Sequence, residues 1–187
     1  AESRDEGGDL ARPRVAGPVA FRPTPMNDAS RQSCTKIEQV LGQSPAFQKV
    51  DKNFYVVRQG SAYVYLLVSD WGADRALVRF VAQLARGVEM NPDLALKLLR
   101  INARLRFGAF GFVRDSSCVT FSHTLLGGET LDDAEILATL RDVALVSDEY
   151  DDQIVEEAGG QTMQQLLEES ALASLKGELE HRGWGEA

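Results

Sequence analysis

Histidine and cysteine are the side chains in which nucleophilic catalysis is easiest to recognise, and the 187-residue chain has only two of each. His123 falls in a predicted strand, where we expect a structural role, and His181 falls near the end of a predicted helix. Cys34 and Cys118 form neither a CxxC motif nor a zinc-ligand spacing. Ser-His-Asp and Cys-His sites both need a histidine base. We therefore predict no catalytic residue and a protein that is not an enzyme.

Two further patterns suggest bound groups only weakly. The acidic run at 148–152 lacks the alternating ligands and central glycine of a calcium loop, so we interpret it as a solvated helix face. The glycines of 108–111 follow a helix and precede a strand, the reverse of the order that cradles phosphate. We predict no metal and no cofactor.

A basic and aromatic cluster is the strongest candidate for a binding site. Arg100, Arg104, Phe107 and Phe110 lie close together in the sequence and resemble a nucleic-acid surface. A net charge of −8 and a pI near 4.8 argue against phosphate backbones, however. We therefore predict that these residues meet protein partners and not nucleic acid.

The charge is unevenly distributed along the chain. Residues 1–28 carry a net charge of −1, residues 29–128 carry +6, and residues 129–187 carry −13. The simplest interpretation is two differently charged faces of one protein. No uncharged run approaches the roughly 18 apolar residues of a membrane span, so we expect a soluble protein.

The first half of the chain indicates an arm, a helix and strands. Four prolines and no regular period predict a flexible arm over 1–28. Ser30 is placed to cap a helix that runs to about Leu41. Aromatic and β-branched runs at 47–58 and 62–69 predict antiparallel strands, and alternation at 75–86 favours a third.

The second half adds better-marked helices. Asn91 as cap and Pro92 as first helical residue start a helix over 92–105. Runs at 107–113 and 118–125 predict a hairpin across the turn at 114–117.

The remaining sequence predicts two more helices. A Thr130 and Asp133 pair resembles a capping box ahead of a long helix over about 131–157. Gly159 and Gly160 end it, and a last helix spans about 162–181.

Several of these segments resemble the YbjN-type domains, which share the fold of type III secretion chaperones. The likeness covers about residues 30–165, with the cyanobacterial and plastid members most similar. It is carried by the segment 98–112, the strand 119–125 with His123, and residues 131–135, 143–154 and 159–161. The arm and the last helix depart from the compact pattern of that family.

The resemblance implies an α+β fold in the order α-β-β-β-α-β-β-α, with an antiparallel sheet of about five strands, helices packed on it and an extra C-terminal helix. We assign 1–28 to the arm, 29–160 to the chaperone-like domain and 161–187 to an acidic helix and tail. The resemblance also implies a domain, often dimeric, that binds an extended or unfolded segment of another protein without ATP. A homodimer is left open.

Our leading hypothesis is a non-enzymatic peptide-binding or complex-assembly chaperone. The alternatives are a stable structural or regulatory subunit of a larger complex, possibly photosynthetic in kind, and, least favoured, an unrecognised hydrolase. Leu172, Leu175 and Leu179 form an apolar stripe on the last helix that must be buried in a partner or in the core. The sequence starts without methionine, which fits a chloroplast stroma location after removal of a transit peptide as well as a cytoplasmic one.

Overall fold

A computed structural model of the chain describes residues 26–181, with side chains through Ser174. It confirms an α+β fold with an antiparallel sheet and a C-terminal helix. The predicted arm lies outside the described residues, apart from residues 26–28, which contain the start of the first helix. The boundaries proposed for three parts of the chain stay a prediction.

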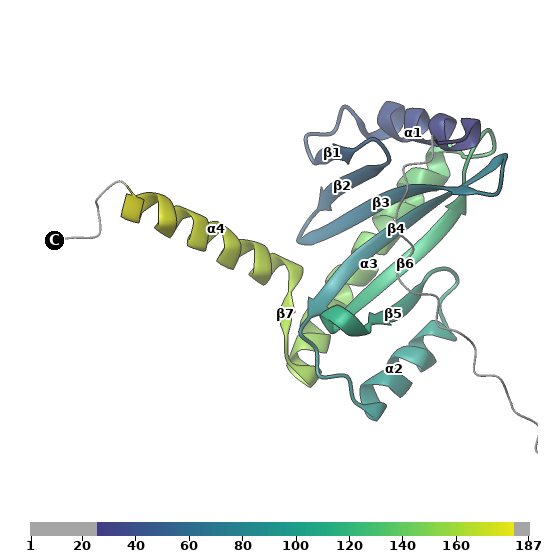
Figure 1. The fold of residues 1–187 in the computed structure, drawn as a ribbon. Helices are drawn as coiled ribbons and strands as arrows, with labels where there is room; N and C mark the ends of the chain where they lie inside the picture. Colours follow the sequence, from purple (N-terminus) through teal and green to yellow (C-terminus); the bar gives the residue numbers. More distant parts are fainter. Residues whose placement is uncertain (1–25, 182–187) are drawn as a thin grey trace, which may run out of the picture.

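The sheet has seven strands rather than about five. Six of them lie in the order β1-β2-β3-β4-β6-β5, and the short β7 pairs with the end of β4. Every pairing is antiparallel (Figure 1). The strands are β1 (Phe47–Asp51), β2 (Phe54–Gln59), β3 (Ala62–Trp71), β4 (Arg75–Arg86), β5 (Ala109–Val113), β6 (Cys118–Leu126) and β7 (Gln161–Thr162).

Three helices pack on this sheet, and the fourth starts at β7 and extends away from the sheet. The helices are α1 (Asp28–Leu41), α2 (Pro92–Asn102), α3 (Asp133–Ala158) and α4 (Met163–His181). α1 and α3 pack against β3 and β4, and α2 packs against β5 at the end of the sheet. In Figure 1 the strands lie in front of α3, and α4 extends to the left away from the sheet.

The core lies between α1, α3 and the inner sheet face. The strand predicted at 75–86 is confirmed as β4, whose even-numbered residues from Ala76 to Leu84 are all buried. The predicted inner stripe of α3 meets them: Ile136, Val143 and Ile154 are almost fully buried. The alternate residues of β4 and the apolar stripe of α3 therefore pack against each other in one apolar layer.

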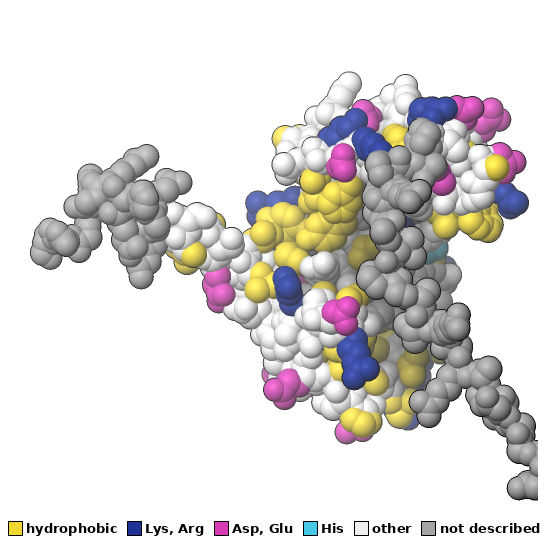
Figure 2. Space-filling view, in the orientation of Figure 1, with side chains coloured by type: hydrophobic (Ala, Val, Ile, Leu, Met, Phe, Trp, Pro, Cys, Tyr) yellow, Lys and Arg dark blue, Asp and Glu magenta, His cyan; other side chains and the backbone are white. Residues whose placement is uncertain are grey.

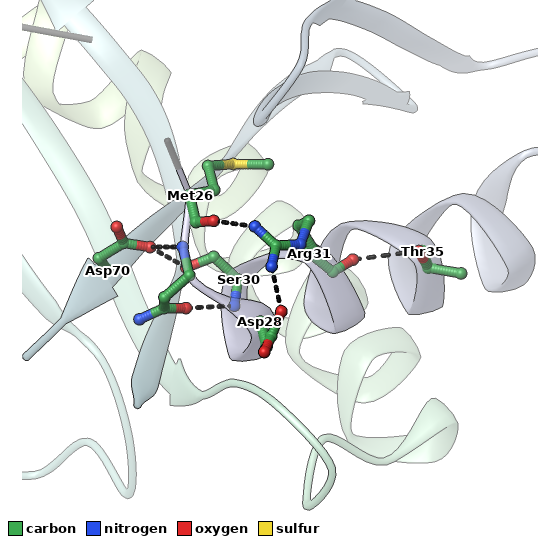
Figure 3. Close-up of polar contacts among 7 residues, drawn as sticks. Met26, Asp28, Ser30, Arg31, Thr35 and Asp70 are labelled. Carbon is green, nitrogen blue, oxygen red and sulfur yellow. Dashed lines mark hydrogen bonds and ion pairs between the residues drawn. The ribbon is translucent and has the colours of Figure 1, made fainter. Parts of the chain in front are cut away.

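The first helix begins earlier than predicted, because Asn27 and not Ser30 is its cap. The Asn27 side chain accepts a hydrogen bond from the Ser30 N–H at 2.8 Å. Asp70 at the end of β3 then accepts from the Asn27 N–H (3.1 Å) and the Ser30 hydroxyl (2.5 Å), while Arg31 contacts Asp28 and the Met26 carbonyl (Figure 3). Ser30 therefore fastens α1 to the sheet instead of capping it.

The predicted strand at 47–58 is also wrong as a single element. A turn at Lys52 and Asn53 divides it into β1 and β2, which pair with each other. The Asn53 side chain donates to the Val68 carbonyl at 2.8 Å, so this turn is held against β3. Asparagine favours such turns because its short amide competes for backbone partners.

Two other helix boundaries differ from the prediction because a polar side chain binds backbone groups near the end of the helix. α2 starts at the predicted Asn91 cap and Pro92 but ends at Asn102, not at residue 105, because the Asn102 side chain binds the backbone of Phe110. Asp132, and not Thr130, caps α3 by accepting from the Ala134 and Glu135 N–H groups. The predicted break at Gly159 is confirmed as the end of α3.

Candidate functional site

A mainly apolar pocket lies between α2 and β5. Leu94 and Leu98 bury one side of α2 in the core, which leaves Leu99 63% exposed on the pocket rim. The pocket has a volume of about 230 Å³. It is lined by Met90, Ala95, Leu98, Leu99, Asn102, Phe110, Gly111 and Phe112.

Beside this pocket the outer edge of β5 faces away from β6, the one strand that pairs with β5 within the described part of the chain. The Phe110 N–H donates to Asn102 Oδ1 at 2.7 Å, and Asn102 Nδ2 donates to the Phe110 carbonyl at 3.2 Å. Phe110 therefore belongs to a pair that makes no ladder hydrogen bonds with β6, and alternation puts Phe112 on the same edge. Within residues 26–181, no hydrogen bond from outside the ladder reaches the Phe112 N–H or carbonyl.

The structure separates the residues predicted to bind a partner. Phe110 is only 7% exposed and packs on Phe121 (ring centroids 5.1 Å apart) and Tyr150 (5.3 Å), so it forms the inner wall of the pocket. Phe107 packs edge-on against the His123 ring at 5.3 Å. Arg100 and Arg104 are exposed at and just after the end of α2.

The predicted leucines lie elsewhere, on α4. Leu172 is 66% exposed, and Leu175 and Leu179 belong to the same helix but to the part whose side chains are not described. α4 contacts β3, β4 and β7, whereas the pocket is formed by α2 and β5. The structure therefore does not bring the two predicted groups together.

His123, Cys34 and Cys118, the remaining residues that could take part in catalysis, have surroundings typical of structural residues. His123 Nδ1 accepts a hydrogen bond from the Gly108 N–H at 3.0 Å, which holds the loop before β5. Burial raises the pKa of the Cys34 thiol and of the Cys118 thiol. A nucleophilic cysteine needs a lowered pKa, so neither thiol is activated.

Sequence reasoning missed Met90, Leu99, Asn102 and Phe112 as pocket residues. One signal was present in the sequence but was not used: Leu99 lies outside the stripe formed by Leu94 and Leu98, as an apolar residue on the outer side of the helix would. The edge position of Phe112 depends on strand order, which the local sequence does not encode.

A strand edge beside an apolar pocket is the kind of site at which protein-binding domains can add an extended peptide as a further strand. None of the helices in residues 26–181 is long and apolar enough to cross a membrane. The chain belongs to the family described as T3SS (YopN, CesT) and YbjN peptide-binding chaperone 1, whose family model matches residues 31–166. No curated protein matches the chain significantly.

The match confirms the predicted YbjN-type and type III secretion chaperone-like domain and its peptide-binding character. Cyanobacterial or plastid affinity, the cellular compartment and the identity of any complex stay predictions from the sequence.

Proposed function

We propose that the protein is a non-enzymatic chaperone that binds an extended segment of another protein at the free edge of β5. The segment adds as a strand beside Phe112 and places one apolar side chain in the pocket under Leu99. Main-chain hydrogen bonds then provide affinity for any extended chain, and the pocket selects the side chain.

One observation carries this proposal: the apolar pocket and the edge-facing backbone of Phe112 lie side by side. Residues at alternate positions of an added strand point to the same face, so a strand paired at Phe112 can direct a side chain toward the pocket. Asn102 already makes the hydrogen bonds that such a strand would make at Phe110, because its side-chain amide is hydrogen-bonded to both the N–H and the carbonyl of that residue. Arg100 and Arg104, exposed near the rim, favour segments with a flanking carboxylate.

Leu99→Asp tests the pocket, and Leu145→Asp on the exposed side of α3 is the matched control. Both leucines lie on helices and are similarly exposed, at 63% and 59%. The probe is a panel of fluorescein-labelled octapeptides with one central leucine or phenylalanine among threonines and one terminal aspartate. Burial of such a side chain is worth about 1.5–3 kcal/mol, which corresponds to roughly a 10- to 100-fold change in affinity.

We expect fluorescence anisotropy to show saturable binding to the wild type and to Leu145→Asp, and at least tenfold weaker binding to Leu99→Asp. Methylation of the peptide nitrogens that face β5 should remove binding while the side chains stay the same. Absence of binding across the panel, equal loss in both variants, or no effect of methylation would contradict the proposal.

A chaperone and a stable subunit differ in how long they hold their partner. A chaperone is expected to exchange a captured segment for an unlabelled competitor, because the pocket buries a single side chain. A permanent subunit is expected to stay stoichiometric with its complex through extensive washing. Affinity capture of native partners with the wild type and Leu99→Asp distinguishes these cases.

A further inference from the structure

The space between α2 and β5 is closed at one end by Asn102, the last residue of α2. Its side chain accepts from the Phe110 N–H at 2.7 Å and donates to the Phe110 carbonyl at 3.2 Å. Leu99 and Ala95, about one and two turns earlier on the helix, line the pocket instead. Figure 2 shows hydrophobic side chains at the lower end of the molecule, where α2 and β5 lie in Figure 1. A segment that enters the pocket therefore meets the Asn102 amide on one side.

β5 offers an added strand very little backbone. In an antiparallel ladder, residues that bond the neighbouring strand alternate with residues that face the outer edge. Phe110 and Phe112 face that edge, and Asn102 already occupies Phe110. β5 ends at Val113, where the 3₁₀ helix η1 (Arg114–Ser116) begins the turn to β6. Within the described residues, Phe112 is thus the one residue of β5 whose edge-facing N–H and carbonyl have no hydrogen-bond partner.

Phe112 also determines which residue of a segment enters the pocket. In the antiparallel direction, which every pairing of this sheet has, the residue opposite Phe112 exchanges two main-chain hydrogen bonds with it. The side chain of that residue lies on the same sheet face as Phe112. The pocket is on this face, because Phe110 and Phe112 both line it. The same residue of the segment is therefore hydrogen-bonded and buried.

We infer that Asn102 is a positioning residue that sets the register of the bound segment and limits its recognition to one residue. The inference rests on the proposed function and names the class of segment that it takes. That class is a stretch of about three residues centred on one apolar side chain, without a sequence requirement on the Asn102 side. A longer strand gains the backbone of Phe110 only by displacing the Asn102 amide.

Peptide methylation in the wild type and in Asn102→Ala tests this register. The probes are the labelled octapeptides with a central leucine, each carrying one N-methyl group at a different position. In the wild type we expect one sensitive nitrogen, the one that donates to the Phe112 carbonyl. In Asn102→Ala the Phe110 carbonyl is free, so a second sensitive nitrogen should appear two residues away. The unmethylated peptide should then bind at least about fivefold more tightly, since two hydrogen bonds are added.

Asn53→Ala is the matched control for loss of an asparagine that holds a strand. The Asn53 side chain donates to the Val68 carbonyl at 2.8 Å and does not line the pocket. This variant should keep a single sensitive nitrogen. Because methylated and unmethylated peptides are compared within one variant, a general loss of folded protein does not change the pattern.

Hydrogen exchange of the free protein tests the Asn102 contact without a peptide. The Phe110 amide should exchange more slowly than the Phe112 amide in the wild type, and the two rates should become similar in Asn102→Ala.

Three results would overturn the inference and leave the proposed function standing: two sensitive nitrogens in the wild type, an unchanged pattern in Asn102→Ala, or equal exchange of the two amides in the wild type. A wild type that binds no peptide would overturn both proposals.

Discussion

Gly108 is a position where side-chain size is limited by both the backbone and the core. Its φ is +69°, and an added Cβ would lie 2.5 Å from the Phe121 ring and 3.1 Å from the Ser122 carbonyl. Gly108→Ala is expected to lower the free energy of unfolding by about 2–5 kcal/mol, the combined cost of left-handed backbone and overpacking. Urea denaturation measures this loss of stability.

Gly60→Ala is the control, because Gly60 has a φ of +64° with open space around it, and this change should cost only about 1–2 kcal/mol. Equal losses of stability in the two variants would show that the contact with the Phe121 ring is unimportant.

Glu38 gives the protein a defined pH dependence at the junction of α1, β1 and β2. Its carboxylate accepts from Lys49 Nζ at 2.7 Å and from the Tyr55 hydroxyl at 2.8 Å. The Lys49 hydrogen bond, followed by that of Tyr55, lowers the pKa of Glu38 below its ordinary value despite partial burial. A carboxyl with a lowered folded pKa stabilises the native state above its unfolded pKa of about 4.3, and the contribution disappears as the pH falls through the folded pKa.

Glu38→Gln should therefore be less stable than the wild type at pH 7, and the gap should close as the pH approaches 3. Denaturant unfolding at pH 7, 5 and 3.5 measures the gap. Glu149→Gln is the control, because Glu149 is exposed and forms no ion pair within the described residues. A gap for Glu38→Gln that is constant with pH would contradict the role of its charge.

At the scale of single elements, α3 depends on its cap because its first turn is exposed. Asp132 accepts from the Ala134 N–H at 2.8 Å and from the Glu135 N–H at 3.2 Å. Asp132→Ala is expected to cost about 1 kcal/mol, whereas Asp132→Asn should cost only a few tenths because asparagine caps nearly as well. Thermal melting followed by circular dichroism compares them. Thr130→Ala should have little effect on stability. A larger loss of stability in Thr130→Ala than in Asp132→Ala would indicate that Thr130 is the cap, as the sequence predicted.

At the scale of the described domain, the sheet has strands that are unequally covered, and this predicts how local stability varies across it. β4 is paired on both sides and lies under α1 and α3, whereas β1 pairs, among residues 26–181, only with β2 and is largely exposed. Native-state hydrogen exchange should therefore show β4 amides exchanging through global unfolding and β1 amides through local opening. Equal protection in the two strands would indicate that β1 is covered in solution.

Local sequence determined the features that depend on neighbouring residues. The Asn91 and Pro92 start of α2, the end of α3 at Gly159 and the alternation of β4 were all predictable, because capping, backbone freedom and a period of 2 act within a few residues. The family resemblance extended this to the order of helices and strands along the chain and to peptide binding.

Only the tertiary structure decided which surfaces are available. Phe110 and Phe112 lie two residues apart on β5, yet Phe110 is buried because it packs on Phe121 and Tyr150, whereas Phe112 is 38% exposed. Arg58, Arg75 and Arg79 share the sheet face opposite α1 and α3, although they come from β2 and β4, which are held side by side by β3. Exposure and charge patterns of this kind depend on contacts between distant residues, and the chain alone does not specify them until the sheet has formed.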